Sequence, residues 1–103
     1  MTDEAAHNDV GKARLDLLDA DAMYALGNVL LFGEQKYGAT NWRKGMAWSK
    51  LVGSALRHIF ARMRGERLDA ESGLPHLAHA MCCLMFLLSY ETHGNGTNDL
   101  PHG

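Results

Sequence analysis

Apolar residues recur at three- and four-residue intervals in three stretches of this chain, the spacing that lines one face of an α-helix. The first stretch covers residues 22–32. Asp19 or Asp21 can cap its start, because a carboxylate accepts hydrogen bonds from the first free backbone amides of a helix. The pattern predicts a helix that ends near Lys36, just before a glycine.

The other two stretches lie further along the chain. Residues 48–63 repeat apolar side chains with a period of about 3.6 residues, and Gly65 marks their end. The third stretch begins at Pro75, a residue suited to the first turn of a helix, and extends to about Glu91. Within it, residues 77–88 are apolar on every side. A helix of that kind has to be buried all round.

Three helices from one chain cannot completely enclose one of their own number. We therefore predict an all-α fold, a bundle of about three main helices per chain whose core is completed by oligomerisation. The assembly is a homodimer with a shared four-helix core, or a homotetramer of two such dimers. The 103 residues form a single domain, residues 1–103. Residues 1–13 and 93–103 are expected to be flexible, because polar and turn-forming residues dominate them.

Composition narrows the class of protein. Apolar residues make up 47% and charged residues 21%, which is typical of a folded globular chain. A formal charge of −2 argues against binding to DNA or RNA, because such proteins are usually basic. The longest apolar run, residues 77–88, is too short to cross a bilayer. The adjacent Cys82 and Cys83, and a start without a basic, apolar leader, predict a reduced cytoplasmic location.

Three carboxylates crowd the connection between the second and third helices. Glu66, Asp69 and Glu71 lie close together, and the spacing from Glu66 to Asp69 puts both on one face of a helical turn. Carboxylates this close repel one another unless a cation sits among them, and Mg2+ or Mn2+ take oxygen ligands. The alternative is an acidic loop that is merely solvated.

Two histidines follow the acidic loop. His76 and His79 lie three residues apart at the start of the third helix and point toward the same end of it. Beside three carboxylates they indicate a metal or catalytic site; the alternative is a pair of core-edge histidines bonded to carbonyl groups. A zinc site of His76, His79 and Cys83 is conceivable too. Glu34, near the C-terminal end of the first helix, is mildly unfavourable there, which hints at a nearby cation or at simple exposure.

The connection between the first and second helices, residues 36–45, mixes cations, aromatic rings and glycines. Lysine and arginine hold phosphates, an aromatic face stacks on a base, and asparagine reads a base edge. The candidate nucleotide-binding residues in this connection are Lys36, Tyr37, Asn41, Trp42, Arg43 and Lys44. Arg57 and His58 of the second helix complete the set. The alternative is a structural connection in which Trp42 plugs the core and the cations are solvated.

Three motifs occur in order along the chain: KYG..NW..G over residues 36–45, LRH over 56–58, and GE..D.ESGLPHLAHA over 65–80. With them, residues 11–91 resemble the dATP/dGTP diphosphohydrolases of phages and bacteria, a MazG-like branch of the all-α NTP pyrophosphohydrolases. The resemblance implies a helical bundle of two or four chains. It also implies an enzyme that uses Mg2+ or Mn2+ to hydrolyse purine (deoxy)nucleoside triphosphates, such as dGTP or dATP, to monophosphate and pyrophosphate.

The resemblance extends to the residues of the site. It implies that the catalytic residues are Glu66, Asp69, Glu71 and His76. It implies that the metal ligands come from Glu34, Glu66, Asp69, Glu71, His76 and His79. One departure stands out, because the wider superfamily carries an ExxE motif on one helix and an ExxD motif on a later one. Here Glu66 to Asp69 is the only ExxD, and ExxE is absent. Glu34 or the two histidines are candidates for the missing ligands.

The expected reaction is attack of a metal-activated water on the α-phosphorus, with a carboxylate or histidine near the metal taking the proton. The resemblance suggests a role in phage nucleotide-pool control or in modified-purine supply, in the host cytoplasm if the chain is phage-encoded. A different class of function stays open. A non-catalytic helical oligomer would use the same loop to bind a nucleotide or a partner protein.

Overall fold

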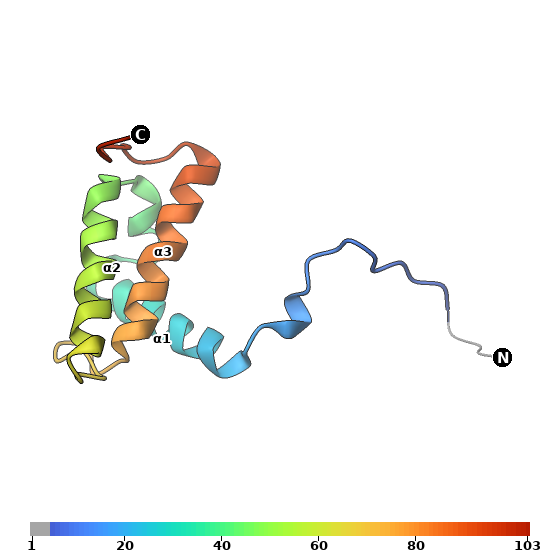
Figure 1. The fold of residues 1–103 in the computed structure, drawn as a ribbon, viewed down its shortest axis with the longest axis horizontal. Helices are drawn as coiled ribbons and strands as arrows, with labels where there is room; N and C mark the ends of the chain where they lie inside the picture. Colours follow the sequence, from blue (N-terminus) through green and yellow to red (C-terminus); the bar gives the residue numbers. More distant parts are fainter. Residues whose placement is uncertain (1–4) are drawn as a thin grey trace.

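The computed structural model describes residues 5–103, and its main elements are helices (Figure 1). They are η1 (Leu15–Leu17), α1 (Ala20–Tyr37), η2 (Asn41–Lys44), α2 (Trp48–Met63) and α3 (His76–His93), where η marks a short 3-10 helix. The described residues contain no β-strand, only two isolated bridges. The all-α prediction is confirmed, and each predicted long helix lies within about two residues of its predicted bounds.

The N-terminal segment is separate from the helices in Figure 1. Residues 5–13, which belong to the segment predicted to be flexible, are exposed and form no helix. Residues 1–4 of that segment lie outside the described residues. Flexibility of this segment stays a prediction.

Helix α1 begins because Asp19 caps it. The Asp19 Oδ2 atom accepts a hydrogen bond from the backbone amide of Ala22 at 2.8 Å. Of the two aspartates that the sequence offers, Asp19 is therefore the cap, and Asp21 lies in the first turn. The helix ends at Gly38, whose φ of +93° is strained for a residue with a side chain. The chain can turn sharply at this point toward η2.

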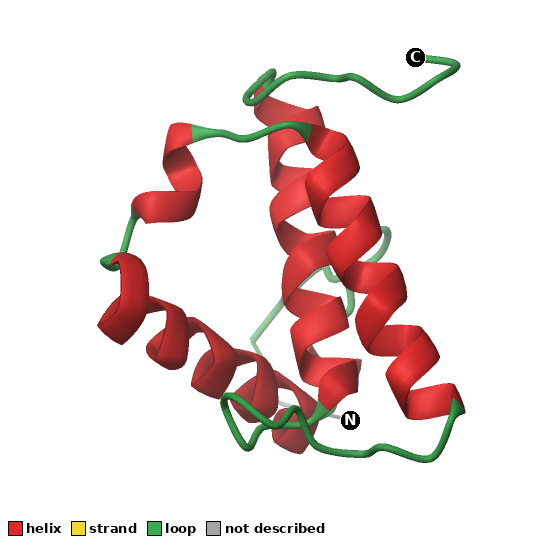
Figure 2. Cartoon of the chain, turned by 90° about the vertical axis from the view of Figure 1, so that its left-hand side faces the viewer, coloured by secondary structure: helices red, strands yellow, loops and turns green. Residues whose placement is uncertain are grey.

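Helices α2 and α3 lie side by side and form the main packing of the chain (Figure 1). Small buried residues, among them Ala55 of α2 and Ala80 of α3, allow the two helices to approach closely. Helix α1 crosses this pair at an angle (Figure 2). It contributes Val29 to a small apolar core with Ala78 and Cys82 of α3. The three helices therefore share α3 as their common partner.

The connection between α1 and α2 is fastened to α3 by aromatic residues. The Trp42 ring of η2 stacks on Phe86 with centroids 4.4 Å apart and an interplanar angle of 11°. The hydroxyl of Tyr90, a fully buried residue, donates a hydrogen bond to the Trp42 carbonyl. These contacts fix η2 between the ends of α1 and α2.

The segment after α3 folds back over the start of α2. The Trp48 amide donates to the Thr97 carbonyl at 3.0 Å. The carboxylate of Asp99 accepts from the Ser49 amide at 2.9 Å and from the Ser49 hydroxyl at 2.6 Å. Asp99 thus satisfies a free amide at the N-terminus of α2, which has no capping side chain of its own. These bonds anchor part of residues 93–103, for which the sequence predicts flexibility.

Helix α3 is apolar but is not enclosed by the single chain. Leu77, Leu84 and Leu88 leave 54%, 51% and 63% of their surfaces exposed. Their spacing of seven and four residues places them on one stripe of α3. Across residues 5–103, no helix combines the length and the apolar character needed to span a bilayer. Complete burial of α3 therefore requires a second chain, whose presence stays a prediction.

Candidate functional site

The loop between α2 and α3, residues 64–75, positions the acidic side chains. It doubles back on itself, and Leu68 forms an antiparallel bridge with Pro75. The loop has no helical turn between Glu66 and Asp69. The two carboxylates therefore do not share a helix face, although their spacing predicted that they would. The fold instead directs them to different histidines of α3.

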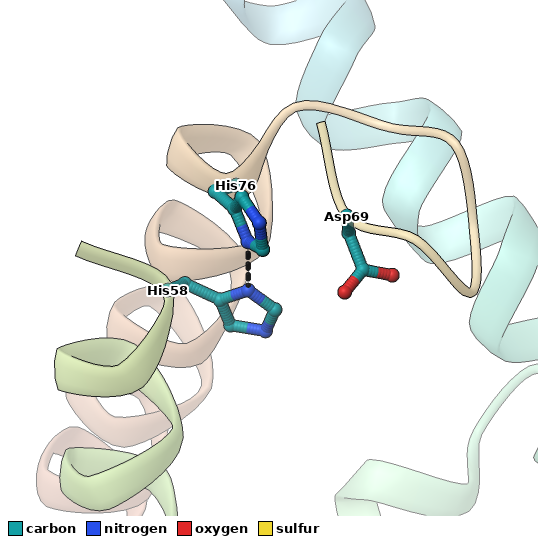
Figure 3. Close-up of side chains that lie close together, drawn as sticks. All are labelled: His58, Asp69 and His76. Carbon is teal, nitrogen blue, oxygen red and sulfur yellow. Dashed lines mark hydrogen bonds between the residues drawn. The ribbon is translucent and has the colours of Figure 1, made fainter. Parts of the chain in front are cut away.

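Three imidazoles from two helices meet beside this loop. His58 of α2 and His76 of α3 approach with their Nδ1 atoms 2.8 Å apart (Figure 3). His79, one turn further along α3, stacks its ring on that of His58, with centroids 4.7 Å apart. The side chains of His76 and His79 are only 7% and 13% exposed. Asp69 faces the pair from the loop (Figure 3).

Ser72 holds Asp69 in place and in its ionised form. The amide and the hydroxyl of Ser72 each donate to Asp69 Oδ2 at 2.9 Å. The same hydroxyl lies 2.6 Å from His79 Nε2. Burial raises the pKa of the Asp69 carboxyl, but the hydrogen bonds from Ser72 outweigh burial and leave that pKa below its ordinary value. A carboxylate therefore faces the imidazoles.

The surroundings favour the neutral forms of His58 and His79. Burial lowers the pKa of His58, and repulsion from a charged His79 or His76 lowers it further. Burial also lowers the pKa of His79, against the opposing attraction of Asp69. A neutral imidazole has a free lone pair, and this is the form that binds a metal ion.

His76 carries a buried nitrogen that has no hydrogen-bond partner, its Nε2 atom. The Oε2 atom of Glu66 lies 3.4 Å away, a contact that is too poorly directed to count as a hydrogen bond. An unpaired buried polar group costs roughly 1–3 kcal/mol. In native proteins such groups are rare, and they recur at functional sites.

His58, Asp69 and His76 form a group whose possible ligand atoms all lie within 4.8 Å of one another. Two imidazole nitrogens and a carboxylate oxygen are donors that divalent cations accept. The residues present therefore fit a divalent cation. Of the other predicted ligands, Glu66 and His79 lie next to this group and contact His76 and Asp69, respectively.

A cavity of about 520 Å³ lies between α1, η2, α2 and α3. His58, Asp69 and His79 line it, so the imidazole group borders the cavity. Glu34 and Glu71, two further predicted ligands, line it as well. Its apolar wall includes Val29, Leu30, Met46, Leu51 and Phe86. A volume of this size suits a small-molecule ligand.

Two lysines also line this cavity. Lys36, in the last turn of α1, forms an ion pair with Glu71. That hydrogen bond raises the pKa of the Lys36 amine, which therefore stays protonated. Lys50, near the start of α2, lines the same space, as do the predicted Tyr37 and Asn41. Positive charge and hydrogen-bonding groups thus face the cavity together with the carboxylates.

Trp42 is a part of the fold rather than a free stacking surface. Phe86 covers its ring, and the Arg43 guanidinium lies 4.5 Å from the ring centroid. Trp42 and Phe86 both line the cavity, whereas Arg43 lines a separate hollow that Trp42 also borders. The structure favours the alternative in which Trp42 plugs the core.

Some sequence predictions fall outside this site. The cavity is not lined by Arg43, Lys44 or Arg57. The Cys83 thiol contacts Ser54 Oγ at 3.4 Å and is not part of the group of His58, Asp69 and His76, which speaks against the zinc alternative.

Sequence reasoning also left two features out. It assigned His58 to the nucleotide; His58 lines the cavity, as that assignment requires, and also lies in the group with Asp69 and His76. It overlooked Ser72, which joins Asp69 to His79. The signal for Ser72 was its position three residues after Asp69, since aspartate commonly bonds a nearby backbone amide in a turn. No comparable signal connects His58 to the acidic loop.

Residues 2–100 match the family described as dATP/dGTP diphosphohydrolase, N-terminal. The chain belongs to this family. Over 79 residues it is 40% identical to a protein of Salmonella phage PMBT28 named dATP/dGTP diphosphohydrolase, and this alignment covers 77% of the chain. The chain spans only 27% of the length of that relative. No solved structure matches the chain.

Proposed function

We propose that this chain hydrolyses purine deoxynucleoside triphosphates, dGTP or dATP, to the monophosphate and pyrophosphate. One observation carries the proposal. A carboxylate–imidazole group that fits a divalent cation borders a cavity that also contains lysines and an apolar wall. Phosphoryl chemistry depends on positioning and on neutralising charge, and these groups supply both. The name of the phage relative supports the same activity.

The polar and apolar parts of the cavity are separated along α3. His79 and Phe86 both line the cavity. They are seven residues apart, which is about 10 Å along the helix axis. The phosphates therefore lie near His79 and Asp69, and the purine lies near Phe86 and Leu51. Lys36 and Lys50 neutralise phosphate charge between these two ends.

The reaction is a displacement at the α-phosphorus. The oxygen of a water molecule forms a bond to this phosphorus, the bond to the oxygen bridging to the β-phosphate breaks, and pyrophosphate leaves. Glu71 accepts the proton of the water, because it lines the cavity and loses its partner when Lys36 turns to the phosphates. Asp69 is less suited to this role, since Ser72 already holds its carboxylate.

The cofactor in this proposal is a divalent cation, for which the resemblance implies Mg2+ or Mn2+. His58, Asp69 and His76 would hold the cation, and Glu66 would support His76 from the outside. A bound cation supplies neutralising charge for the triphosphate and lowers the pKa of a bound water. In an infected cell this activity would control purine deoxynucleotide pools or supply a modified-purine pathway.

Product analysis tests the reaction. Incubation with dGTP in 18O-labelled water is expected to give labelled dGMP and unlabelled pyrophosphate. Asp69→Asn is expected to lower turnover about 100-fold or more, whereas Asp21→Asn, on the exposed first turn of α1, leaves turnover unchanged. Orthophosphate and dGDP as first products would refute attack at the α-phosphorus.

A non-catalytic role is the second candidate function. The same cavity would then bind a nucleotide or a partner without chemistry, and calorimetry would detect dGTP binding while no product forms. The acidic loop and the group of His58, Asp69 and His76 favour hydrolysis, because a binding module has no need of a carboxylate beside a possible cation site.

We further propose that the chain works as a homodimer, alone or as half of a tetramer. The α3 stripe of Leu77, Leu84 and Leu88 is more than half exposed. Helix α2 carries a similar exposed stripe, formed by Leu56, Phe60 and Met63. Apolar patches of this kind on a folded chain mark protein interfaces, and a second copy offers matching stripes.

A further inference from the structure

We propose that His58, Asp69 and His76 are direct ligands of one divalent cation, and that the site prefers first-row transition cations to Mg2+. The proposal deepens the function proposed above and rests on it for its biological meaning. Cation binding itself can be measured without turnover. The proposal assigns His58 to the metal, whereas the sequence pattern assigns it to the nucleotide.

The two imidazoles are spaced as neighbouring ligands of one ion. Their Nδ1 atoms lie 2.8 Å apart. Two nitrogens bound at right angles to one ion, with bonds of about 2.0–2.1 Å, lie about 3 Å apart. Asp69 faces both rings (Figure 3), and all three possible ligand atoms lie within 4.8 Å of one another. Small side-chain movements bring the three residues to one ion.

A hydrogen bond between His58 and His76 is the alternative to a shared cation. Each neutral imidazole carries one N–H. If His58 donates, the proton of His76 is on Nε2, 3.4 Å from Glu66 Oε2; if His76 donates, its Nε2 is a buried acceptor without a donor. The two alternatives differ in whether a cation binds between the rings, which metal titration measures.

A cation on Nδ1 requires the proton of His76 to be on Nε2, and Glu66 Oε2 lies 3.4 Å from that atom. A ligating histidine commonly donates its second N–H to a carboxylate, which fixes the ring orientation. The position of Glu66 is therefore that of a supporting carboxylate rather than a ligand.

His79 and Ser72 support the other two ligands. The His79 ring stacks on His58 with centroids 4.7 Å apart, which limits the orientations of His58. His79 Nε2 lies 2.6 Å from the Ser72 hydroxyl, which in turn donates to Asp69. Because Nε2 is engaged in this chain of contacts, His79 is a positioning residue in the proposal.

The donor set determines the preferred cation. Mg2+ favours oxygen ligands and keeps several of its waters, so two imidazoles suit it poorly. Nitrogen ligands suit later first-row cations, and affinity for such sites rises from Mn2+ to Co2+. The site formed by His58, Asp69 and His76 is therefore expected to bind Co2+ more tightly than Mn2+, and Mn2+ more tightly than Mg2+.

Metal titration of the metal-free protein tests this order. Calorimetry is expected to give the order Co2+, Mn2+, Mg2+, and about 100-fold excess Mg2+ should fail to displace Co2+. Pulsed electron paramagnetic resonance of the Mn2+ form should show coupling to 14N, because imidazole nitrogen is bound directly. The visible absorption of the Co2+ form reports the same ligation independently of catalysis.

His58→Phe is the decisive variant, because phenylalanine keeps a ring against His79 but cannot bind metal. Affinity for Co2+ should fall by at least about tenfold. His93→Phe, at the exposed end of α3, is the matched control and should bind as the original chain does. Circular dichroism checks that each variant folds. If His58→Phe does not fold, Asp69→Asn in the loop provides the same test.

Three results would overturn the proposal: equal affinities for Mg2+ and Co2+, absence of 14N coupling, or unchanged Co2+ binding in His58→Phe or in its substitute Asp69→Asn. Failure of this kind is separable from failure of the proposed function. Hydrolysis of dGTP with Mg2+ and weak Co2+ binding would keep the function and refute the site. Tight Co2+ binding through His58, with no dGMP formed under any cation, would keep the site and refute the function.

Discussion

Lys36, in the last turn of α1, forms an ion pair with Glu71, which lies in the loop before α3. Both residues line the same cavity. Their side chains are 40% and 61% exposed, so the ion pair contributes little to stability and can exchange partners easily. A triphosphate that draws Lys36 away would leave the Glu71 carboxylate free to accept a proton. The pair thus connects substrate binding with the chemistry proposed here.

The two members of this pair are expected to respond differently to mutation. Lys36→Met should raise KM for dGTP about tenfold, because a phosphate contact is lost. Glu71→Gln should lower kcat about 100-fold with little change in KM, because a proton acceptor is lost. Steady-state kinetics at saturating cation measure both effects. Lys44→Met is the control, since Lys44 does not line the cavity; an equal change in that variant would contradict the assignment.

Trp42 is expected to matter for stability and not for base recognition. Trp42→Ala should lower the free energy of unfolding by about 3 kcal/mol, because the contacts with Phe86 are lost. Trp42→Phe should keep most of this stability and leave KM for dGTP unchanged. Urea unfolding and kinetics measure the two quantities. A large rise in KM for folded Trp42→Phe would show that the indole contacts the purine after all.

The Asp99–Ser49 contact predicts a pH-dependent stability. Hydrogen bonds from the Ser49 hydroxyl and amide hold the pKa of the Asp99 carboxyl below its ordinary value. The stabilisation is therefore complete above the unfolded pKa of about 3.9 and is lost as pH falls through the lower folded value. Asp99→Ala should lower the melting temperature by a few degrees at pH 7, and the difference should vanish toward pH 2.

A control separates this effect from general acid denaturation. Asp9→Ala, in the exposed N-terminal segment, should melt like the original chain at every pH. A melting difference for Asp99→Ala that persists unchanged at pH 2 would mean that the contact acts through packing and not through the carboxylate.

Cys82 is expected to be chemically inert in the folded chain. Burial raises the pKa of its thiol to about 12, so almost none of it is thiolate at pH 8. Iodoacetamide at pH 8 should leave Cys82 unmodified in the native protein and should modify it in urea. Tandem mass spectrometry distinguishes it from the adjacent Cys83. Equal modification rates in both conditions would show that this part of α3 is open.

The predicted oligomer can be disrupted on α3. Light scattering should give at least a dimer, well above the 11.3 kDa of one chain. Leu84→Glu should shift the protein toward the monomer, because a charge cannot be buried in an apolar interface without a partner. Tyr24→Glu is the control, as Tyr24 is 77% exposed on α1. A folded monomer of the unmodified chain at micromolar concentration would refute the oligomer.

The sequence by itself determined the local structure. Periodic apolar residues predicted all three long helices, because a 3.6-residue period is a property of the local backbone. Asp19 caps the start of α1, and Gly38 ends the helix with a positive φ. The resemblance that three motifs carry indicated the family, which the comparisons confirm for residues 2–100.

Only the tertiary structure decided which side chains meet. His58 and His76 are 18 residues apart, and no local rule brings their Nδ1 atoms to 2.8 Å. Pairing of α2 with α3 does so, because it is set by the burial of side chains distributed over both helices. The same packing stacks Phe86 on Trp42, a residue whose type suits base stacking equally well. Local patterns specify helices, whereas a site depends on distances that exist only once the helices are packed.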